Sequence, residues 1–236
     1  MTAVVETATQ VPVTAGVEQA ARGGELGALR QAFLLLTKVR VFGKPREEEK
    51  LRVYEYEHGV VREGGGAELA VFRWDEISDA MQSVTPHFQN GRYNGTTFAY
   101  RFARSDRVAF VIDGTFIDPA HSRRAASVPV NQHRCWAELG AAAIRYVAEA
   151  QTAGAKLALT TGERLTFGDI VISLQGVHTE KYGIVPWTRV VEVYTRDGRV
   201  YLKLGDKAVL LSARPAGHVP NLALLKIVVD TFAKHG

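Results

Sequence analysis

Two short stretches that each contain a tryptophan decide the fold: VFRWDEI at residues 71–77 and VPWTRV at residues 185–190. In both, an apolar residue stands two positions before the Trp and an aliphatic residue stands three positions after it. The shared spacing of Trp74 and Trp187 predicts that one fold is written twice. The alternative is a chance similarity between two β-rich segments.

The residues before each Trp extend the correspondence. A Gly-Val pair at residues 59–60 lies 15 residues before the first Trp, and a Gly-Val pair at 176–177 lies 11 residues before the second. The surplus falls at the GGG run of residues 64–66, and a surface turn tolerates insertions. We therefore interpret the difference in length as a longer turn in the first copy.

Alternating apolar and polar residues on either side of these words predict short antiparallel strands in both halves. Asn-Gly pairs within residues 88–95 and the Asp-Gly pair at 197–198 are typical of hairpin turns. The segments that we expect to form strands are LRVYEYEHGVV, ELAVFRWDEI, TTFAYRFA and RVAFVID in the first half, and LALTT, RLTFGDIVIS, GVHTEKYGIVPW, RVVEVYT, RVYLKL and AVLLSA in the second.

Each run of strands is followed by a helical pattern. The segment NQHRCWAELGAAAIRYVAEAQTAG has an apolar stripe at Trp136, Leu139, Ala143, Val147 and Ala150, which predicts a helix from an N-cap at Asn131 to a stop at Gly154. A second stripe in the last 16 residues predicts another helix; its members are Leu224, Leu225, Val228 and Phe232. Strands followed by a helix, twice over, predict tandem domains.

The expected domain limits follow from these patterns. Residues 1–24 have no helical stripe and predict a flexible tail, residues 25–153 form the first domain, and residues 154–236 form the second. Between the tail and the first alternating strand, ELGALRQAFLLLTKVRVF predicts a short helix that passes into a strand, and GKPREEEK predicts a solvated loop.

Composition places the chain among globular proteins of a reducing compartment. Hydrophobic residues make up 46% of the chain, and the single Cys135 excludes an internal disulfide. The start of the chain has no signal-peptide pattern, and no apolar stretch reaches the roughly 20 residues that a membrane span needs. We therefore expect a cytoplasmic protein, with peripheral binding to the inner face of the membrane as an alternative.

The formal charge of +4 is unevenly placed. From Gly154 onward there are 11 Lys/Arg and 7 Asp/Glu, a surplus of four, whereas the earlier residues cancel. An anionic partner would favour such a segment, but acidic residues interrupt the basic ones, which is typical of a solvated face.

The second half resembles bacterial pleckstrin-homology-like (PH-like) domains. The matching words are GERLTFGDIVISLQGV, VPWTRVVEV, DGRVYL and VPNLALLKIVVD, and the chain from about Leu26 is similar to an uncharacterised actinobacterial PH-like family through LRVYEYEHGVV and VFRWDEI. The resemblance implies two mainly β, PH-like barrels, each with antiparallel strands followed by a C-terminal helix. It also implies binding of phosphoinositides, peptides or partner domains rather than catalysis, and self-association into a homo-oligomer.

The lipid-binding pattern of that family is incomplete in this chain. Members that bind phosphoinositides carry several Lys/Arg around the first hairpin, where this sequence offers Lys156 and Arg164 followed by the acidic Asp169. Inositol-lipid recognition is therefore in doubt, and the resemblance favours a protein partner.

No catalytic or metal-binding signature stands out. Asp113, Asp118 and His121 match no ligand spacing and predict a polar loop, and His133 and Cys135 would point some 200° apart on a helix. Phosphate loops, zinc-protease helices and nucleophile elbows are missing from the sequence. His178 and Glu180 are typical of a solvated strand. We therefore expect no enzyme activity, no cofactor and no metal.

Residues that favour binding cluster in one later strand. Arg199, Tyr201 and Lys203 alternate, so they would share one face, and Lys207 follows them. Three such residues make a weak platform for nucleic acid, which we consider an unlikely partner. The full candidate binding set is Lys156, Arg164, Arg199, Tyr201, Lys203 and Lys207, and the expected structural tryptophans are Trp74, Trp136 and Trp187.

The sequence thus predicts a non-enzymatic interaction module that binds protein partners. The alternative is a peripheral binder of anionic membrane lipid that uses the basic C-terminal domain.

Overall fold

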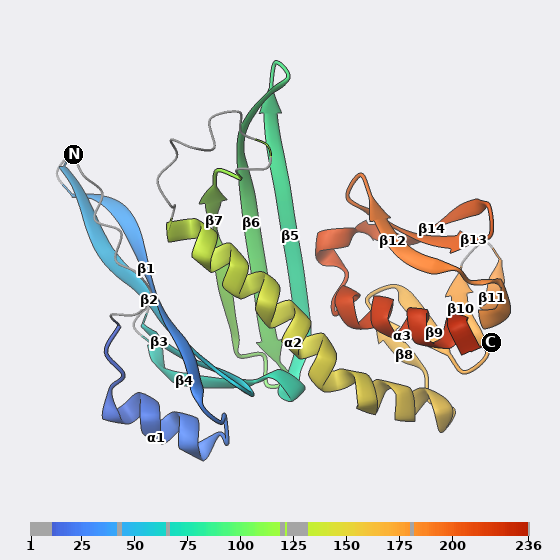
Figure 1. The fold of residues 1–236 in the computed structure, drawn as a ribbon, viewed down its shortest axis with the longest axis horizontal. Helices are drawn as coiled ribbons and strands as arrows, with labels where there is room; N and C mark the ends of the chain where they lie inside the picture. Colours follow the sequence, from blue (N-terminus) through green and yellow to red (C-terminus); the bar gives the residue numbers. More distant parts are fainter. Residues whose placement is uncertain are drawn as a thin grey trace.

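The structure is a computed structural model that describes residues 11–41, 44–64, 67–118, 121, 132–179 and 182–235. The side chains of residues 35–50, 67, 68, 132, 133 and 235 lie outside the described part. The chain is mainly β with helices, and its strands form four antiparallel sheets, none of which closes into a barrel in the described residues (Figure 1). The expected barrels are therefore replaced by two open sheets in each half.

The first half contains a short helix, a four-stranded meander, a single turn of 3-10 helix, a three-stranded meander and a long helix. In chain order these are α1 (Ala15–Gly23), β1 (Leu29–Val41), β2 (Lys44–Tyr56), β3 (Gly59–Gly64), β4 (Ala67–Arg73), η2 (Trp74–Glu76), β5 (Ile77–Gln89), β6 (Arg92–Arg104), β7 (Ala109–Phe116) and α2 (Gln132–Thr160).

The second half repeats the meanders, the 3-10 turn and the closing helix. Its elements are β8 (Leu165–Phe167), β9 (Ile170–Ser173), β10 (Gly176–Thr179), β11 (Gly183–Pro186), η4 (Trp187–Arg189), β12 (Glu192–Arg196), β13 (Arg199–Leu204), β14 (Lys207–Pro215), η5 (Ala216–His218) and α3 (Leu222–His235).

The strand order and one cross-strand residue pairing are the same in both halves. The sheets run β1-β2-β3-β4 and β5-β6-β7 in the first half, and β11-β10-β9-β8 and β12-β13-β14 in the second. Gly59 pairs with Arg73 and Gly176 pairs with Pro186, so a glycine faces the residue just before each Trp. A Cβ on either glycine would collide with a carbonyl oxygen of the paired strand. The two tryptophan segments therefore occupy equivalent positions in two halves of the same topology.

Helix α2 is shared by two hydrophobic cores. Its first part contributes Trp136, Leu139 and Val147 to the core of the first half. Its last part contributes Ala155 and Leu159 to the core of the second half. In Figure 1 this helix crosses the β5-β6-β7 sheet and continues toward the second half. The two halves therefore do not have separate cores joined by a free linker.

The sequence prediction misplaced the end of this helix. Gly154 was expected to stop it and LALTT to form a strand, but residues 154–160 continue α2. A glycine inside a helix costs about 1 kcal/mol relative to alanine. Burial of Ala155 and Leu159, at 8% and 0% exposure, compensates for that cost by packing in the second core. In the predicted stripe, Ala150 is exposed instead of buried.

The expectation of a flexible tail is wrong for residues 15–23, which form α1. Thr14 caps this helix through its hydroxyl, which accepts a hydrogen bond from the backbone N–H of Val17. Val17 and Ala21 are buried against Tyr54 of β2 and its neighbours. Two buried positions one turn apart are too short a stripe to recognise in sequence. Residues 1–10 lie outside the described residues.

Tyr54 also holds the chain before α1 against the sheet. Its hydroxyl lies 3.0 Å from Oε2 of Glu63 and 3.1 Å from the carbonyl oxygen of Pro12. Burial raises the pKa of Tyr54 to about 12, so the phenol keeps its proton as a donor.

Two further expectations for the first half are wrong. Residues 25–28 are not helical, and Leu29 already begins β1. The described part of GKPREEEK, from Lys44, belongs to β2 instead of a loop. These residues pair with β1, for example Arg46 with Val39, so the hairpin partner decided the conformation of a charged, proline-containing segment.

Candidate functional site

The candidate binding residues of the second half lie on the outer face of the β12–β13–β14 sheet. Val193, Val200 and Leu202 are buried in the second core, so they define the inner face. Successive side chains of a strand point to opposite faces. The outer face therefore carries Glu192, Tyr194 and Arg196 of β12 and Arg199, Tyr201 and Lys203 of β13.

Two tyrosines stack at the centre of this face. Tyr194 and Tyr201 are cross-strand partners, and their ring centroids lie 5.6 Å apart with an angle of 21° between the ring planes. Leu210 of β14 pairs with Tyr201 on the other side and is 50% exposed. The row Tyr194–Tyr201–Leu210 thus crosses all three strands. We call it, together with Arg196, Arg199 and Lys203, the tyrosine face.

The hairpin turn sets this register. Asp197 and Gly198 have φ values of 50° and 69°, both positive, as a two-residue type I′ turn requires. The turn places Arg196 opposite Arg199, and every following pair of the two strands is fixed by it. The Asp-Gly pair therefore brings the two tyrosines together.

Three cations surround the row. The guanidinium carbon of Arg196 lies 5.7 Å from the centre of the Tyr201 ring, and its Nε lies 3.5 Å from Oδ2 of Asp197. Nη1 of Arg199 donates a 2.7 Å hydrogen bond to the carbonyl oxygen of Ala213. Nζ of Lys203 lies 3.4 Å from Oε1 of Glu192. Exposed pairs of this kind hold their partners weakly, so the cations remain available to an acidic ligand.

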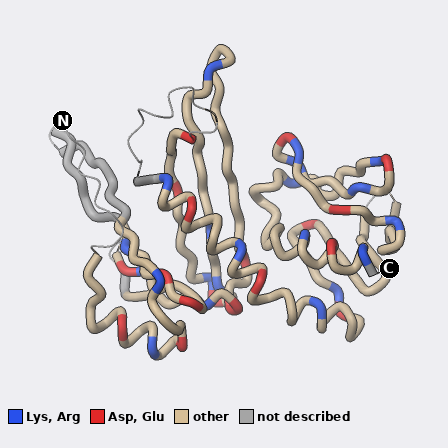
Figure 2. The backbone as a smooth tube through the Cα atoms, in the orientation of Figure 1, with Lys and Arg blue, Asp and Glu red and all other residues tan. Residues whose placement is uncertain are grey.

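The structure brings together only part of the predicted binding set. Arg199, Tyr201 and Lys203 share the face as expected. Lys207 pairs with Leu204, a residue that packs against the second core, and so begins β14 at the far end of the hairpin. Lys156 lies on α2 and Arg164 in the turn after it, outside this sheet. Figure 2 shows basic positions scattered among acidic ones along the backbone of the second half.

Comparison with known proteins adds one finding. Residues 129–235 match the model of a family of unknown function (DUF6585). The matched segment takes in all of α2, both sheets of the second half and α3, so it includes the tyrosine face. No curated protein and no solved structure matches the chain.

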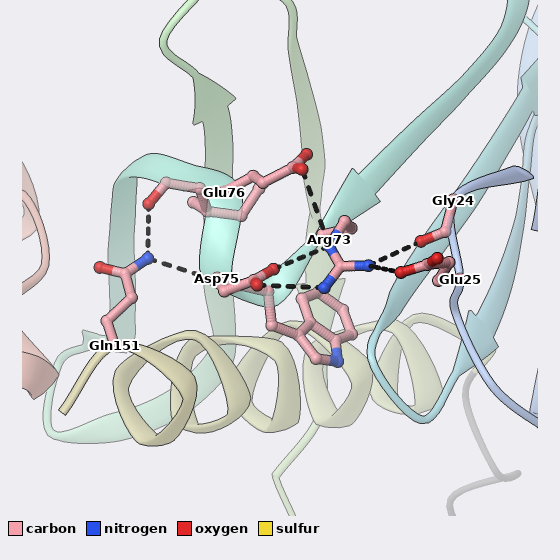
Figure 3. A network of polar contacts seen from close by, with 8 residues as sticks. Gly24, Glu25, Arg73, Asp75, Glu76 and Gln151 are labelled. Carbon is pink, nitrogen blue, oxygen red and sulfur yellow. Dashed lines mark hydrogen bonds and ion pairs between the residues drawn. The ribbon is translucent and has the colours of Figure 1, made fainter. Parts of the chain in front are cut away.

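A second polar cluster, the Arg73 clasp, lies in the first half beside Trp74 (Figure 3). Nε and Nη2 of Arg73 each donate a 3.1 Å hydrogen bond to the carboxylate of Asp75, and Nη1 donates to the carbonyl oxygen of Gly24 at 3.0 Å. Glu25 and Glu76 add ion pairs at 3.7 Å. The hydrogen bonds from Arg73 lower the pKa of Asp75, so the carboxylate stays charged.

The clasp borders an open hollow of about 420 Å³ that Arg104 also lines. Arg104 donates to the carbonyl oxygen of Val71 at 2.7 Å and pairs with Asp106. Both guanidinium groups are therefore engaged within the protein, and carboxylates outnumber them. The cluster fits a structural role: it ties the end of α1 to β4 and the 3-10 turn.

The three tryptophans are core residues. Trp74, Trp136 and Trp187 are 3%, 1% and 7% exposed. Gln151 of α2 fixes the turn that carries Trp74, because its side-chain amide donates to the carbonyl oxygens of Trp74 and Ile77 at 3.2 and 2.6 Å (Figure 3).

The residues considered for catalysis do not assemble into a reactive group. Nε2 of His121 lies 4.0 Å from Oδ2 of Asp118, and its ring contacts Tyr93 and Phe88. Asp113 lies on β7, and Cys135 is half-buried on α2. No three His, Cys, Asp or Glu side chains meet as metal ligands in the part of the chain that the structure describes.

His178 is a residue of β10 with a polar partner on the neighbouring strand. His178 lies 3.0 Å from the hydroxyl of Ser173 on the neighbouring strand, while Glu180 and the side chain of His133 lie outside the described residues. None of the described helices is long and apolar enough to cross a membrane.

Sequence reasoning missed three members of the tyrosine face: Tyr194, Arg196 and Leu210. A signal for the first two was available, because the Asp-Gly turn with two-residue geometry aligns residue 196 with 199 and residue 194 with 201. Leu210 could not be placed this way, because the register of β13 with β14 shifts between Arg199 and Tyr201.

Proposed function

We propose that this chain is a non-enzymatic interaction module made of two PH-like units, and that it binds a protein partner through the tyrosine face. In support, antiparallel strands followed by a helix recur in both halves, which is the outline that the PH-like resemblance implies. Folds of this kind serve as binding platforms, but function is carried by a site and not by the fold.

The observation that carries the proposal is the half-buried stack of Tyr194 and Tyr201, flanked by arginines and the exposed Leu210. Tyrosine and arginine are enriched among residues that dominate binding energy at protein interfaces. A cross-strand tyrosine pair is also held in place by the sheet, so little side-chain entropy is lost when a partner packs on it. The expected partner surface is apolar or aromatic at its centre, with carboxylates near Arg196, Arg199 and Lys203.

The test is capture of partners by tagged chain from cells of the source organism, quantified by mass spectrometry. The variant Tyr194→Thr/Tyr201→Thr removes the rings but keeps residues that favour strands. We expect it to retain the partner at least tenfold less than the wild type. The variant Leu210→Thr should weaken capture to a smaller extent.

The matched control is Val111→Thr. Val111 is an exposed apolar strand residue of the first half, 44% exposed, and lies outside the proposed face. Its captured proteins should equal those of the wild type. Equal capture by the wild type and the double tyrosine variant, both folded by circular dichroism, would remove the proposal.

One observation favours an anionic lipid surface as a second candidate. Arg196, Arg199 and Lys203 stand on the same face as two tyrosines, and tyrosine and basic side chains suit a membrane interface. Charge-driven binding weakens as salt screens it. Sedimentation with phosphatidylserine vesicles over a salt series, with phosphatidylcholine vesicles as control, tests this; absence of sedimentation at low salt excludes it.

A further inference from the structure

An open hollow of about 620 Å³ lies beside helix α1, which packs on the β1-β2-β3-β4 sheet (Figure 1). We call it the α1 hollow. Pockets that hold small organic molecules have volumes of about 300–1,000 Å³, so the α1 hollow has a suitable size. It lies in the first half, outside the residues that match the family of unknown function.

The floor of the α1 hollow is apolar. Val13, Ala21, Leu26 and Leu29 all line it. Ala21 and Leu26 are buried in the small core beneath α1, whereas Leu29 at the start of β1 is 42% exposed. The hollow therefore leaves apolar side chains in contact with water, and an apolar ligand that covered them would be stabilised by removing that surface from water.

The turn between α1 and β1 fixes this floor through hydrogen bonds. The backbone N–H of Leu26 donates to the carbonyl oxygen of Ala21 at 3.0 Å, and the carbonyl oxygen of Leu26 accepts from the N–H of His58 at 2.9 Å. Oε2 of Glu57 accepts from the backbone N–H of Ala28 at 3.1 Å. The turn is thus bound both to the helix and to the end of β2. A ligand would enter a site whose walls are already ordered, which lowers the entropic cost of binding.

Tyr56 of β2 provides a polar group that has no partner at the α1 hollow. It lines the hollow and is only 5% exposed, yet its hydroxyl makes no hydrogen bond with any residue that the structure describes. Tyr54, two positions earlier on the same strand, bonds through its hydroxyl to both Pro12 and Glu63. Burial and the nearby Glu18 carboxylate raise the pKa of Tyr56, so its phenol stays neutral. Buried polar groups are nearly always hydrogen-bonded, so this hydroxyl indicates a missing partner.

The charged side chains at the α1 hollow favour a cation beside Tyr56. Glu25 is paired with Arg73 in the clasp at 3.7 Å. Nε of Arg22 donates to the backbone carbonyl oxygen of Glu18 at 3.4 Å, which keeps this guanidinium against the helix. The carboxylate of Glu18 has neither an ion pair nor a hydrogen bond to the described residues, and it is the charge that acts on Tyr56. An unpaired carboxylate and an unpaired hydroxyl therefore meet at the polar end of an apolar hollow.

From this combination we propose that the α1 hollow binds a small organic cation with an apolar body, of the alkylammonium class. The apolar body covers Ala21, Leu26 and Leu29. The ammonium group donates hydrogen bonds to the hydroxyl oxygen of Tyr56 and to the carboxylate of Glu18. This inference goes beyond the proposed function, because it concerns the other half of the chain and a small molecule instead of a protein.

The first test compares three probes that share one apolar chain and differ in the charge of the head group. Octylammonium, 1-octanol and octanoate are titrated separately into the purified full chain and followed by isothermal titration calorimetry. Octylammonium should bind saturably, about tenfold more tightly than octanol, because its head group pairs with Glu18. Octanoate should bind more weakly than octanol, because two carboxylates repel each other. Absence of octylammonium binding, or equal affinity for octylammonium and octanoate, overturns the proposal.

The second test places the cation at Glu18. Glu18→Gln keeps the shape of the exposed side chain and removes its charge, so octylammonium should bind about tenfold more weakly while octanol binding stays unchanged. The matched control is Glu149→Gln, which removes the charge of an exposed glutamate on α2 outside the hollow. This control should bind octylammonium like the wild type. Equal octylammonium affinity of the two variants overturns the proposal.

The third test addresses the hydroxyl of Tyr56. Because this hydroxyl makes no hydrogen bond within the described protein, Tyr56→Phe should keep the circular dichroism spectrum and the urea midpoint of the wild type. Its affinity for octylammonium should fall about fivefold through the loss of one hydrogen bond to a charged group. Unchanged affinity in Tyr56→Phe overturns the assigned position of the ammonium group. Failure of partner capture through the tyrosine face leaves the proposal intact, because these titrations use the purified chain and small probes alone.

Discussion

The two tryptophans occupy equivalent positions in the two halves, yet different groups hold them. The indole N–H of Trp187 points to the carbonyl oxygens of Ser173 and Leu174, at 3.2 and 3.0 Å. The buried indole Nε1 of Trp74 has no hydrogen-bond partner among the described residues. The first half secures its tryptophan turn from outside, through Gln151 and the Arg73 clasp.

The sequence positions of the clasp explain this difference. Arg73, Asp75 and Glu76 correspond to Pro186, Thr188 and Arg189 in the second half, which cannot form the same ion pairs. The first half also has strands of up to 13 residues and a β5 edge that Asn221 closes, whereas β12 in the second half has five residues. The two halves therefore share a buried scaffold and differ in the polar residues around it.

The strongest test of equivalence is truncation of each tryptophan. Trp74→Ala and Trp187→Ala should each lower the free energy of unfolding by about 3–5 kcal/mol, the usual range for a buried aromatic residue. Because α2 belongs to both cores, each variant should unfold the whole chain in one transition. Urea denaturation followed by circular dichroism and by tryptophan fluorescence measures this. Two separate transitions in either variant would contradict the shared core.

Opening the β5 edge should have the next largest effect. Asn221→Ala removes both side-chain hydrogen bonds to β5 and leaves Ala80 N–H without its partner. We expect a loss of about 2 kcal/mol in the free energy of unfolding. Asn221→Asp keeps the acceptor for Ala80 but loses the donor to Ser78, so its loss should be smaller. Equal stability of Asn221→Ala and the wild type would show that the edge contact is incidental.

A smaller difference should appear when each tryptophan is replaced by phenylalanine. Trp187→Phe removes a donor from two carbonyl oxygens, whereas Trp74→Phe removes an N–H that has no partner among the described residues. The loss in unfolding free energy should be about 1 kcal/mol greater for Trp187→Phe. Thermal or urea unfolding of the two variants measures this difference. An equal loss, or a greater loss for Trp74→Phe, would mean that ring packing alone determines the loss of stability.

The smallest effect concerns the clasp and its pH dependence. Asp75→Asn should cost about 0.5–1 kcal/mol, as expected for a half-exposed ion pair, and the matched change Thr188→Asn should cost nothing. The folded-state pKa of Asp75 lies below its unfolded value of about 3.9. The contribution is therefore complete above that value and is lost as pH falls through the folded pKa. In urea unfolding between pH 6 and pH 3, the difference in stability between wild type and Asp75→Asn should narrow toward the acidic end.

Sequence periodicity predicted the local elements well where side chains decide them. Alternation and the Asp-Gly turn located β12 and β13, and the stripe at Leu224, Leu225 and Val228 located α3. Arg199, Tyr201 and Lys203 were placed on one face for the same reason. These features depend on residues near each other in the chain.

Features that depend on distant residues could not be predicted. Helix α2 passes Gly154 because a core built from residues 167–229 receives its end. The contact between Asn221 and Ala80 joins residues 141 positions apart, and nothing in either neighbourhood indicates the other. The tyrosine stack is an intermediate case, because assigning the Asp-Gly turn as a two-residue turn would have been enough to find it.

The long helix also constrains how the chain could be shortened. The segment that matches the family begins just before α2, so a protein reduced to that segment would keep the helix without the first half. Trp136, Leu139 and Val147 would then lose the strands that cover them. A row of large apolar side chains left in water promotes association or aggregation. Any such protein would need a replacement cover for that stripe, either from other residues of its own chain or from another subunit.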